Sequence, residues 1–123
     1  MYTLDTNAII YYLKGDSSAS DVLTEIFSQD ATLYISAVTE VELLGFPNLS
    51  DFGSGQILQF IDAIAVIPLD SQIARAAAQI RRSYRGGLAD SVIAATAMFT
   101  GTKLLTRNTD DFKKISGLEV QAI

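Results

Sequence analysis

The sequence predicts an α/β protein with a central, mostly parallel sheet of about five strands flanked by helices. Short apolar runs of strand length alternate along the chain with longer segments whose apolar residues recur at helical spacing. With 123 residues, 49% of them apolar, and no internal repeat or linker, the chain from residue 1 to 123 is expected to fold as one domain.

Local pattern places each element in turn. The expected strands are Tyr2–Asp5, Thr32–Ser36, Ala65–Leu69, Lys103–Thr106 and Leu118–Ile123, and the expected helices are Ser20–Ser28, Ala37–Leu44, Gly55–Ala63, Ser71–Tyr84 and Leu88–Phe99. Apolar residues at i, i+3 and i+4 support the helices, as they do for Ile73, Ala77 and Ile80.

Glycine and proline mark the expected ends of these elements. Gly45 and Pro47 follow the helix over 37–44 and should end it. Gly53 and Gly55 are expected to open the next helix, and Gly86-Gly87 separates the last two long helices.

The chain contains no histidine and no cysteine. Ser-His-Asp and Cys-His nucleophiles, histidine-paired acid–base catalysis and thiolate or imidazole zinc sites are therefore excluded, and the remaining oxygen ligands suit Mg²⁺ or Mn²⁺. The absence of cysteine agrees with a reducing cytoplasm, and neither a basic leader nor an apolar run of about 20 residues is present. We expect a cytoplasmic protein without membrane association.

Charge is distributed unevenly over the two halves of the chain. The net charge of −5 argues against a non-specific nucleic-acid binder. Residues 1–62 carry nine acids and one base, however, whereas residues 63–123 carry eight bases and five acids. The basic residues of the second half are Arg75, Arg81, Arg82, Arg85, Lys103, Arg107, Lys113 and Lys114. They are either a solvated surface or a set of contacts to an anionic partner.

Acidic and amide residues cluster near the carboxyl ends of the predicted strands. They are Asp5 after the first strand, Glu40 and Glu42 in the helix after the second, Asp90 in the helix before the fourth, and Asn108, Asp110 and Asp111 after the fourth. Because the carboxyl ends of parallel strands share one edge of the sheet, these groups should meet there.

Each of these acids has a simpler alternative as a helix cap. Asp5 and Asp90 could cap the helices that follow them, and Thr39-x-x-Glu42 could be a capping box. Two carboxylates about 4 Å apart repel by about 4 kcal/mol at an effective dielectric constant near 20, however, so their convergence favours a bound divalent ion.

Four segments carry recognisable motifs in order: Leu4-Asp5-Thr6-Asn7, Ser36-Ala37-Val38-Thr39-x-x-Glu42-Leu43, Leu88-Ala89-Asp90-Ser91-Val92-Ile93-Ala94-Ala95-Thr96-Ala97 and Leu105-Thr106-Arg107-Asn108-x-x-Asp111-Phe112. Together they resemble the motifs of PIN-domain ribonucleases, and most closely those of the VapC-type toxins of toxin–antitoxin systems. The resemblance spans nearly the whole chain.

The resemblance implies which residues form the active site. Asp5, Glu42 and Asp90 match the metal-binding acids, and either Asp111 or the amide of Asn108 fills the fourth position. Thr6 is expected beside the metal site, Asn7 is expected to hold the turn, and Asp110 should be exposed to solvent. Glu40 lies about 200° around the helix from Glu42, so only one of the two can face the site, and the family pattern selects Glu42.

The implied activity is Mg²⁺- or Mn²⁺-dependent endonucleolytic hydrolysis of RNA, with Asp5, Glu42, Asp90 and Asp111 as catalytic acids. Candidate phosphate contacts are Arg81, Arg82, Arg85 and Arg107. The implied partners are an RNA substrate, a cognate antitoxin and a second copy of the chain. Phe46, Leu49 and Phe52 either belong to a partner surface or are buried in the core.

Two other classes of function remain open. A phosphatase with an aspartyl nucleophile would also place an Asp after a first strand, but such enzymes usually carry a second Asp two residues on, where this chain has Asn7. A catalytically silent PIN-like binding module would have lost one or more of the acids, and three are intact here.

Overall fold

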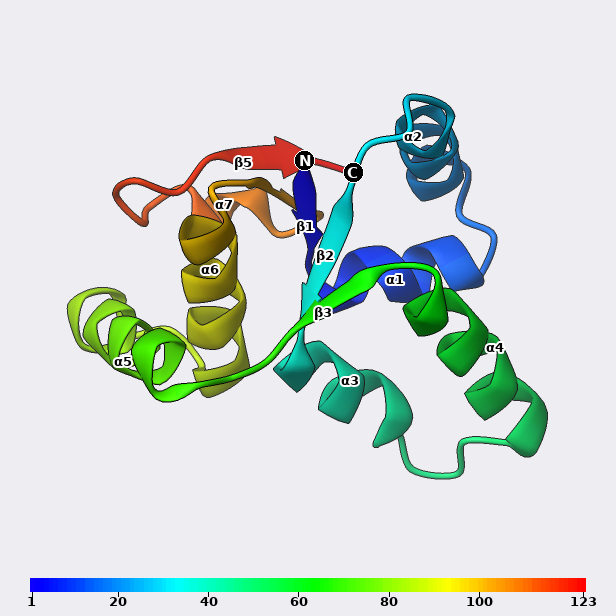
Figure 1. Ribbon diagram of the computed structural model, residues 1–123, viewed down its shortest axis with the longest axis horizontal. Coiled ribbons are helices and arrows are strands. Elements are labelled where there is room, and N and C mark those ends of the chain that lie inside the picture. The colour runs from blue at the N-terminus through cyan, green and yellow to red at the C-terminus, as the bar shows by residue number, and fades with distance from the viewer.

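A five-stranded parallel sheet runs through the middle of the molecule in the computed structural model, which describes residues 1–123 (Figure 1). Its strands are β1 (Tyr2–Leu4), β2 (Leu33–Ser36), β3 (Ala65–Ile67), β4 (Lys103–Thr106) and β5 (Val120–Ala122), arranged in the order β3-β2-β1-β4-β5. Every neighbouring pair is parallel. The predicted fold class is therefore confirmed; β4 has the predicted bounds, and the other four strands are shorter than expected.

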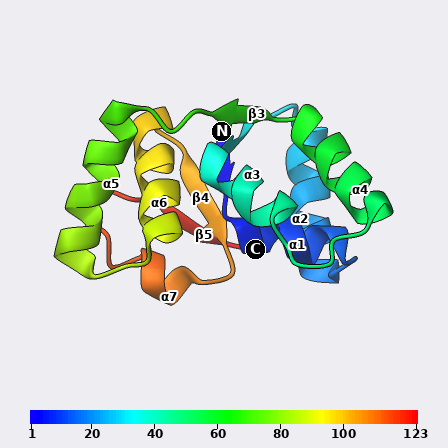
Figure 2. The same cartoon turned by 90° about the horizontal axis from the view of Figure 1, so that it is seen from below.

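Helices cover both faces of this sheet (Figures 1 and 2). They are α1 (Thr6–Leu13), α2 (Ser17–Ser28), α3 (Ala37–Leu44), α4 (Asp51–Asp62), α5 (Ser71–Tyr84), α6 (Leu88–Thr100) and α7 (Thr109–Phe112). None of them combines the length and apolar character needed to cross a membrane.

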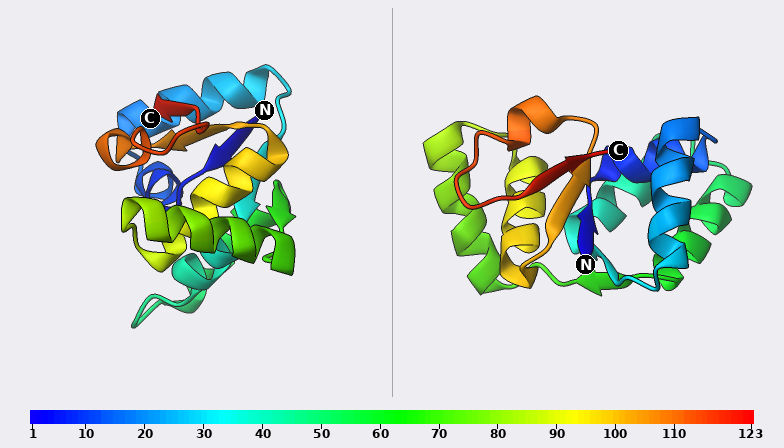
Figure 3. Two further views of the ribbon diagram at one scale, coloured as in Figure 1. Left: turned by 90° about the vertical axis from the view of Figure 1, so that its left-hand side faces the viewer. Right: turned by 90° about the horizontal axis from the view of Figure 1, so that it is seen from above.

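The core has one part on each face of the sheet. On one face, Leu4 and Leu105 of β1 and β4 pack with buried residues of α1, α2, α3 and α4. On the other face, Leu104 packs with Ile93 and Ala97 of α6. Helix α6 is buried continuously from Ser91 to Ala97, because it lies between the sheet and α5 (Figure 3).

The predicted helices over 37–44 and 71–84 have the observed bounds, but other boundaries differ. Helix α2 begins at Ser17 rather than at residue 20, because Asp16 accepts a hydrogen bond from the backbone N–H of Ala19. Helix α4 begins at Asp51, because Ser50 accepts from the backbone N–H of Gly53. The prediction that Gly53 and Gly55 open this helix is wrong, since both lie inside it.

The strand order creates a switch point between β1 and β4. From β1 the chain moves outward to β2 and β3, and it then crosses to β4 on the other side of β1. Connections leaving β1 and β4 therefore diverge, and open α/β folds bind their ligands at such a position, outside the carboxyl ends of the strands. Asp5 directly follows β1, and Thr106 is the last residue of β4.

Candidate active site

Asp5 is held at the switch point by the end of the neighbouring strand. Only 3% of the Asp5 surface is exposed to solvent, and the Asp5 Oδ2 accepts a 2.7 Å hydrogen bond from the hydroxyl of Thr106. The Thr106 oxygen in turn accepts from the backbone N–H of Asn108 at 2.9 Å. Asp5 occupies the N-cap position of α1, but its side chain makes no capping hydrogen bond. The carboxylate is therefore directed toward the end of β4.

Glu42 is brought to the same edge by a hydroxyl from the first motif. The Thr6 hydroxyl donates to Glu42 Oε1 at 2.6 Å, and it lies 3.1 Å from the hydroxyl oxygen of the buried Thr39. The capping-box interpretation of Thr39 and Glu42 is wrong, because Ser36 caps α3 by accepting from the backbone N–H of Val38. The side chain of Glu42 is thereby free to face the site.

Asp90 also has no capping role. Helix α6 begins at Leu88 with Gly87 at the N-cap, so Asp90 lies inside the first turn. It is half-buried at the start of the buried stretch of α6. Burial raises the pKa of its carboxyl, and the charges of Glu42 and Asp111 raise it further. The acids of four separate segments thus act on one another electrostatically.

The strongest perturbation falls on Asp5. Its pKa is raised from an ordinary 3.8 to about 6, mainly because the carboxyl is buried. The charges of Asp90 and Glu42 also raise this pKa, whereas the hydrogen bond from Thr106 lowers it. None of these acids takes part in an ion pair, since the two ion pairs of the molecule join Arg107 with Asp16 and Lys113 with Asp110. The carboxylates are not, however, gathered into a group of three that could hold a metal ion as they stand.

The residues after β4 divide between the site and the solvent. The Asn108 side-chain amide donates to Asp111 Oδ2 at 2.9 Å, so the two candidates for the fourth position contact each other. Asp110 is exposed, as expected, and pairs with Lys113 at 2.9 Å. Asn7 is exposed and makes no side-chain hydrogen bond, so its expected role in holding the turn has no counterpart in the structure.

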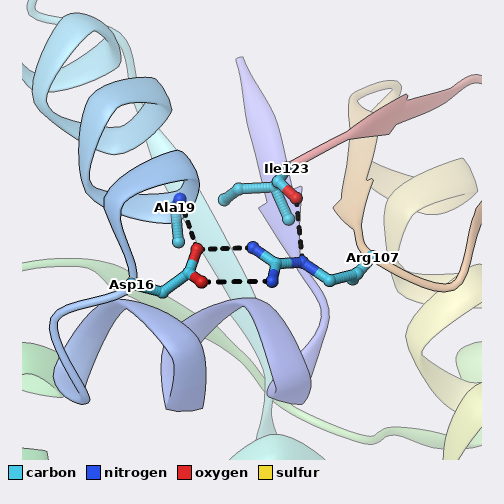
Figure 4. Close-up of polar contacts among 4 residues, drawn as sticks. All are labelled: Asp16, Ala19, Arg107 and Ile123. Atoms are coloured by element: carbon cyan, nitrogen blue, oxygen red, sulfur yellow. Dashed lines mark hydrogen bonds and ion pairs between the residues drawn. The ribbon is translucent and has the colours of Figure 1, made fainter.

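Arg107, a predicted phosphate contact, is instead engaged within the protein (Figure 4). Its Nη2 and Nη1 donate to Asp16 at 2.6 and 3.3 Å, and its Nε donates to the carbonyl of Ile123 at 3.1 Å. The guanidinium also lies 4.0 Å from the ring centroid of Tyr11. These contacts raise the pKa of Arg107 and lower that of Asp16 through their shared hydrogen bonds. The structure therefore gives Arg107 a bridging role between α1, α2 and the carboxyl terminus.

The other three arginines lie in two different places. Arg81 and Arg82 line a mostly apolar cavity of about 510 Å³ between α5 and α6. Arg85 lines a separate cavity of about 350 Å³ together with Asp90 and Asp111. Of the four candidates, only Arg85 shares a cavity with the acids.

The apolar residues considered for a partner surface are divided as well. Phe46 and Phe52 are 45% and 77% exposed, whereas Leu49 packs partly against the core. Phe46 and Phe52 are therefore available to a partner, whereas Leu49 belongs partly to the core.

The sequence interpretation missed two residues that shape the site, Thr106 and Thr39, and it also missed Asp16, the partner of Arg107. For Thr106 a signal existed, since a hydroxyl at the end of one central strand should lie next to Asp5 at the end of its neighbour. For Asp16 there was none, because no strand pairing places the residue before α2 beside Arg107.

Comparison with known proteins gives the family. A model of the PIN domain matches residues 2–118. The chain belongs to the PIN-domain family. It is 32% identical to ribonuclease VapC of Rickettsia bellii over 98% of this chain and 94% of the relative, and 31% identical to ribonuclease VapC10 of Mycobacterium tuberculosis over 97% and 91%. A toxin–antitoxin complex from Klebsiella pneumoniae superposes with a TM-score of 0.80 at 26% identity, over 96% of this chain and 95% of that one. The resemblance indicated by the four motifs is confirmed.

Proposed function

We propose that this PIN-domain protein is a metal-dependent endoribonuclease that hydrolyses RNA phosphodiester bonds, and that it is the toxin of a toxin–antitoxin pair. The observation that carries the proposal is the set of unpaired acids around Asp5 and Asp90 at the β1–β4 switch point. Ribonucleases of the VapC group align with the chain over nearly its whole length, which supports the activity.

The donors at this edge fit Mg²⁺ or Mn²⁺. All are oxygen atoms, and their mutual repulsion would be relieved by a divalent cation. Mg²⁺ in proteins is usually held by one or two carboxylates and keeps several waters, so a preformed group of three carboxylates is not required. Asp5, Asp90 and Glu42 would hold the ion, with Asp111 as the fourth acid.

A bound divalent ion supplies an activated water and stabilises negative charge on the phosphate oxygens. The residues of the chain prepare the site for this chemistry. Thr106 fixes the orientation of the Asp5 carboxylate, and Thr6 does the same for Glu42. The buried stretch of α6 anchors Asp90, and Asn108 steadies Asp111 through its side-chain amide. Such fixed polar groups lose little free energy to reorganisation during a reaction.

The proposed partners follow the same reasoning. A cognate antitoxin protein would cover the site, with exposed Phe46 and Phe52 as part of its contact surface. The solved relative from Klebsiella pneumoniae, a toxin–antitoxin complex, supports such an assembly. We further propose a homodimer that acts in the cytoplasm without membrane association.

An RNA-cleavage assay with and without chelator tests the proposal. Structured RNA should be cleaved in Mg²⁺ or Mn²⁺ and left intact in EDTA, with 5′-phosphate ends on the products. Cleavage that continues undiminished in EDTA would contradict the metal mechanism. Binding of RNA without cleavage would favour a silent binding module, and release of phosphate from a small phosphomonoester without RNA cleavage would favour a phosphatase.

A further inference from the structure

A cavity of about 350 Å³ is lined by two acids of the proposed site and by two basic side chains. Asp90 and Asp111 line it from the start of α6 and from α7, and Arg85 and Lys114 line it from the ends of α5 and α7. Figure 2 shows why these segments meet, since the turn between α5 and α6 lies beside α7. The volume of the cavity is at the small end of the range for ligand sites, about 300–1,000 Å³, and suits one nucleotide unit.

The two cations of this cavity form no ion pair within 4 Å in the protein. Neither Arg85 nor Lys114 belongs to either of the two ion pairs, and neither donates a side-chain hydrogen bond. Both side chains are exposed to solvent and line the cavity. An exposed guanidinium and ammonium next to an acidic site offer charge-assisted hydrogen bonds to a phosphate.

The backbone at Arg85 is unusual for an arginine. Its φ is +54°, in the left-handed region, and it ends α5 at a position where glycine is favoured. Replacement by glycine should therefore relieve backbone strain while removing the charge. The same residue thus allows stability and binding to be separated by experiment.

An aromatic ring and an apolar side chain also line the cavity. Tyr84 lines it, and its phenol oxygen accepts a 3.0 Å hydrogen bond from the backbone N–H of Ser116, which fixes the ring. Ile115 lies with it on the apolar part of the wall. Exposed aromatic rings beside basic groups are typical platforms for single-stranded nucleic acid, because a base of any identity can stack on them.

We propose that this cavity is a nucleotide subsite: the phosphate next to the cleaved bond contacts Arg85 and Lys114, and the attached base lies against Tyr84. The inference rests on the proposed ribonuclease function and names a substrate contact for it. The ligand is single-stranded RNA, because a paired base cannot enter a cavity of this size.

Steady-state cleavage of a single-stranded RNA oligonucleotide with one cleavage site tests the subsite. The double variant Arg85→Gln/Lys114→Gln should raise KM by about tenfold or more, because the loss of one charged hydrogen bond alone costs about that factor, with kcat within twofold of wild type. The matched control is Arg75→Gln/Lys103→Gln, which removes the same charges from exposed positions outside the cavity and should change KM less than twofold.

The second part of the experiment uses an RNA in which a neutral methylphosphonate replaces the phosphate next to the cleaved bond. This replacement should raise KM for wild type and the control variant but not further for the cavity variant, because the two changes remove the same contact. Arg85→Gly should raise KM while leaving the melting temperature unchanged or higher. Additive effects of methylphosphonate and cavity substitutions, or a cavity variant that behaves like the control, would overturn the subsite.

Failure of the subsite and failure of the ribonuclease function are distinguishable. If the wild type binds the oligonucleotide without cleaving it, the proposed activity is wrong. Fluorescence anisotropy with the same variants and the same methylphosphonate RNA then decides the subsite by Kd instead of KM, with the same pattern supporting or overturning it.

Discussion

The hydroxyl of Thr106 donates a 2.7 Å hydrogen bond to the carboxylate of Asp5, although 101 positions separate the two residues in the chain. The contact exists because β1 and β4 are neighbours, with Leu4 paired to Leu105 directly before these residues. It joins the two strand ends that define the switch point. The orientation of the most buried acid of the site therefore depends on the packing of the sheet.

Replacing Thr106 by valine tests this dependence. Thr106→Val should lower the free energy of unfolding by about 1–3 kcal/mol, because a buried carboxylate and a backbone amide lose their shared partner. It should also raise the pKa of Asp5 further, since the hydrogen bond holds that pKa down. Urea unfolding and the pH dependence of metal binding measure both effects. Thr106→Ser restores the hydroxyl, and a serine variant as damaged as the valine variant would contradict this role.

The raised pKa of Asp5 predicts the pH dependence of stability without metal. A carboxyl whose pKa rises from 3.8 to about 6 on folding stabilises the native state fully below about pH 3.8, and this contribution of about 3 kcal/mol is lost as pH rises through 6. Urea unfolding in EDTA from pH 4 to 7.5 should therefore show a steeper decline for wild type than for Asp5→Asn. Identical slopes would mean that Asp5 is not perturbed.

The bridge between Arg107 and Asp16 predicts a structural effect. Arg107→Ala should lower the melting temperature, because it releases Asp16, the Tyr11 ring and the carbonyl of Ile123 together. Asp16→Asn should do the same, whereas Asp110→Asn should have little effect because its ion pair is highly exposed. Unchanged melting of Arg107→Ala with a raised KM for RNA would instead support the original expectation of a phosphate contact.

Asp111 and Asp110 are adjacent in sequence but should differ in function. Asp111 acts on Asp90 and accepts from Asn108, whereas Asp110 pairs with Lys113 at the surface. Asp111→Asn should therefore weaken Mg²⁺-induced stabilisation and RNA cleavage much more than Asp110→Asn. Equal effects of the two substitutions, measured by thermal melting with Mg²⁺ and by cleavage, would show that Asp111 is not part of the site.

Much of the fold could be predicted because it follows from local pattern. The helices over 37–44 and 71–84 have clear apolar periodicity and clear boundaries, and their bounds are confirmed. The short helices α1 and α7 were not among the expected helices, although the capping alternative for Asp5 assumed a helix after it. Helix α7 has only four residues, too few for a periodic signal, and both helices contact distant strands.

The candidate site could likewise be predicted from the sequence only in part. Asp5 and Asp90 were predicted from their position near strand ends, because parallel topology brings such ends together. Whether a carboxylate caps a helix or faces the site depends on side-chain direction, which one sequence does not give. The structure decides this for Asp5 through Thr106 and for Glu42 through Thr6, both contacts across the fold.

The central claim is that the acids at the switch point bind a divalent ion for RNA cleavage. The substitution Asp90→Asn tests this claim most directly. Since burial and neighbouring charges disfavour the Asp90 carboxylate, the neutral variant should be as stable as wild type or more stable in EDTA. The rise in melting temperature on adding Mg²⁺ should shrink, because a ligand stabilises a fold by RT ln(1 + [L]/Kd) and Kd has increased. RNA cleavage should fall by orders of magnitude in fully folded protein. A variant that keeps the wild-type response to Mg²⁺ and the wild-type cleavage rate would contradict the account.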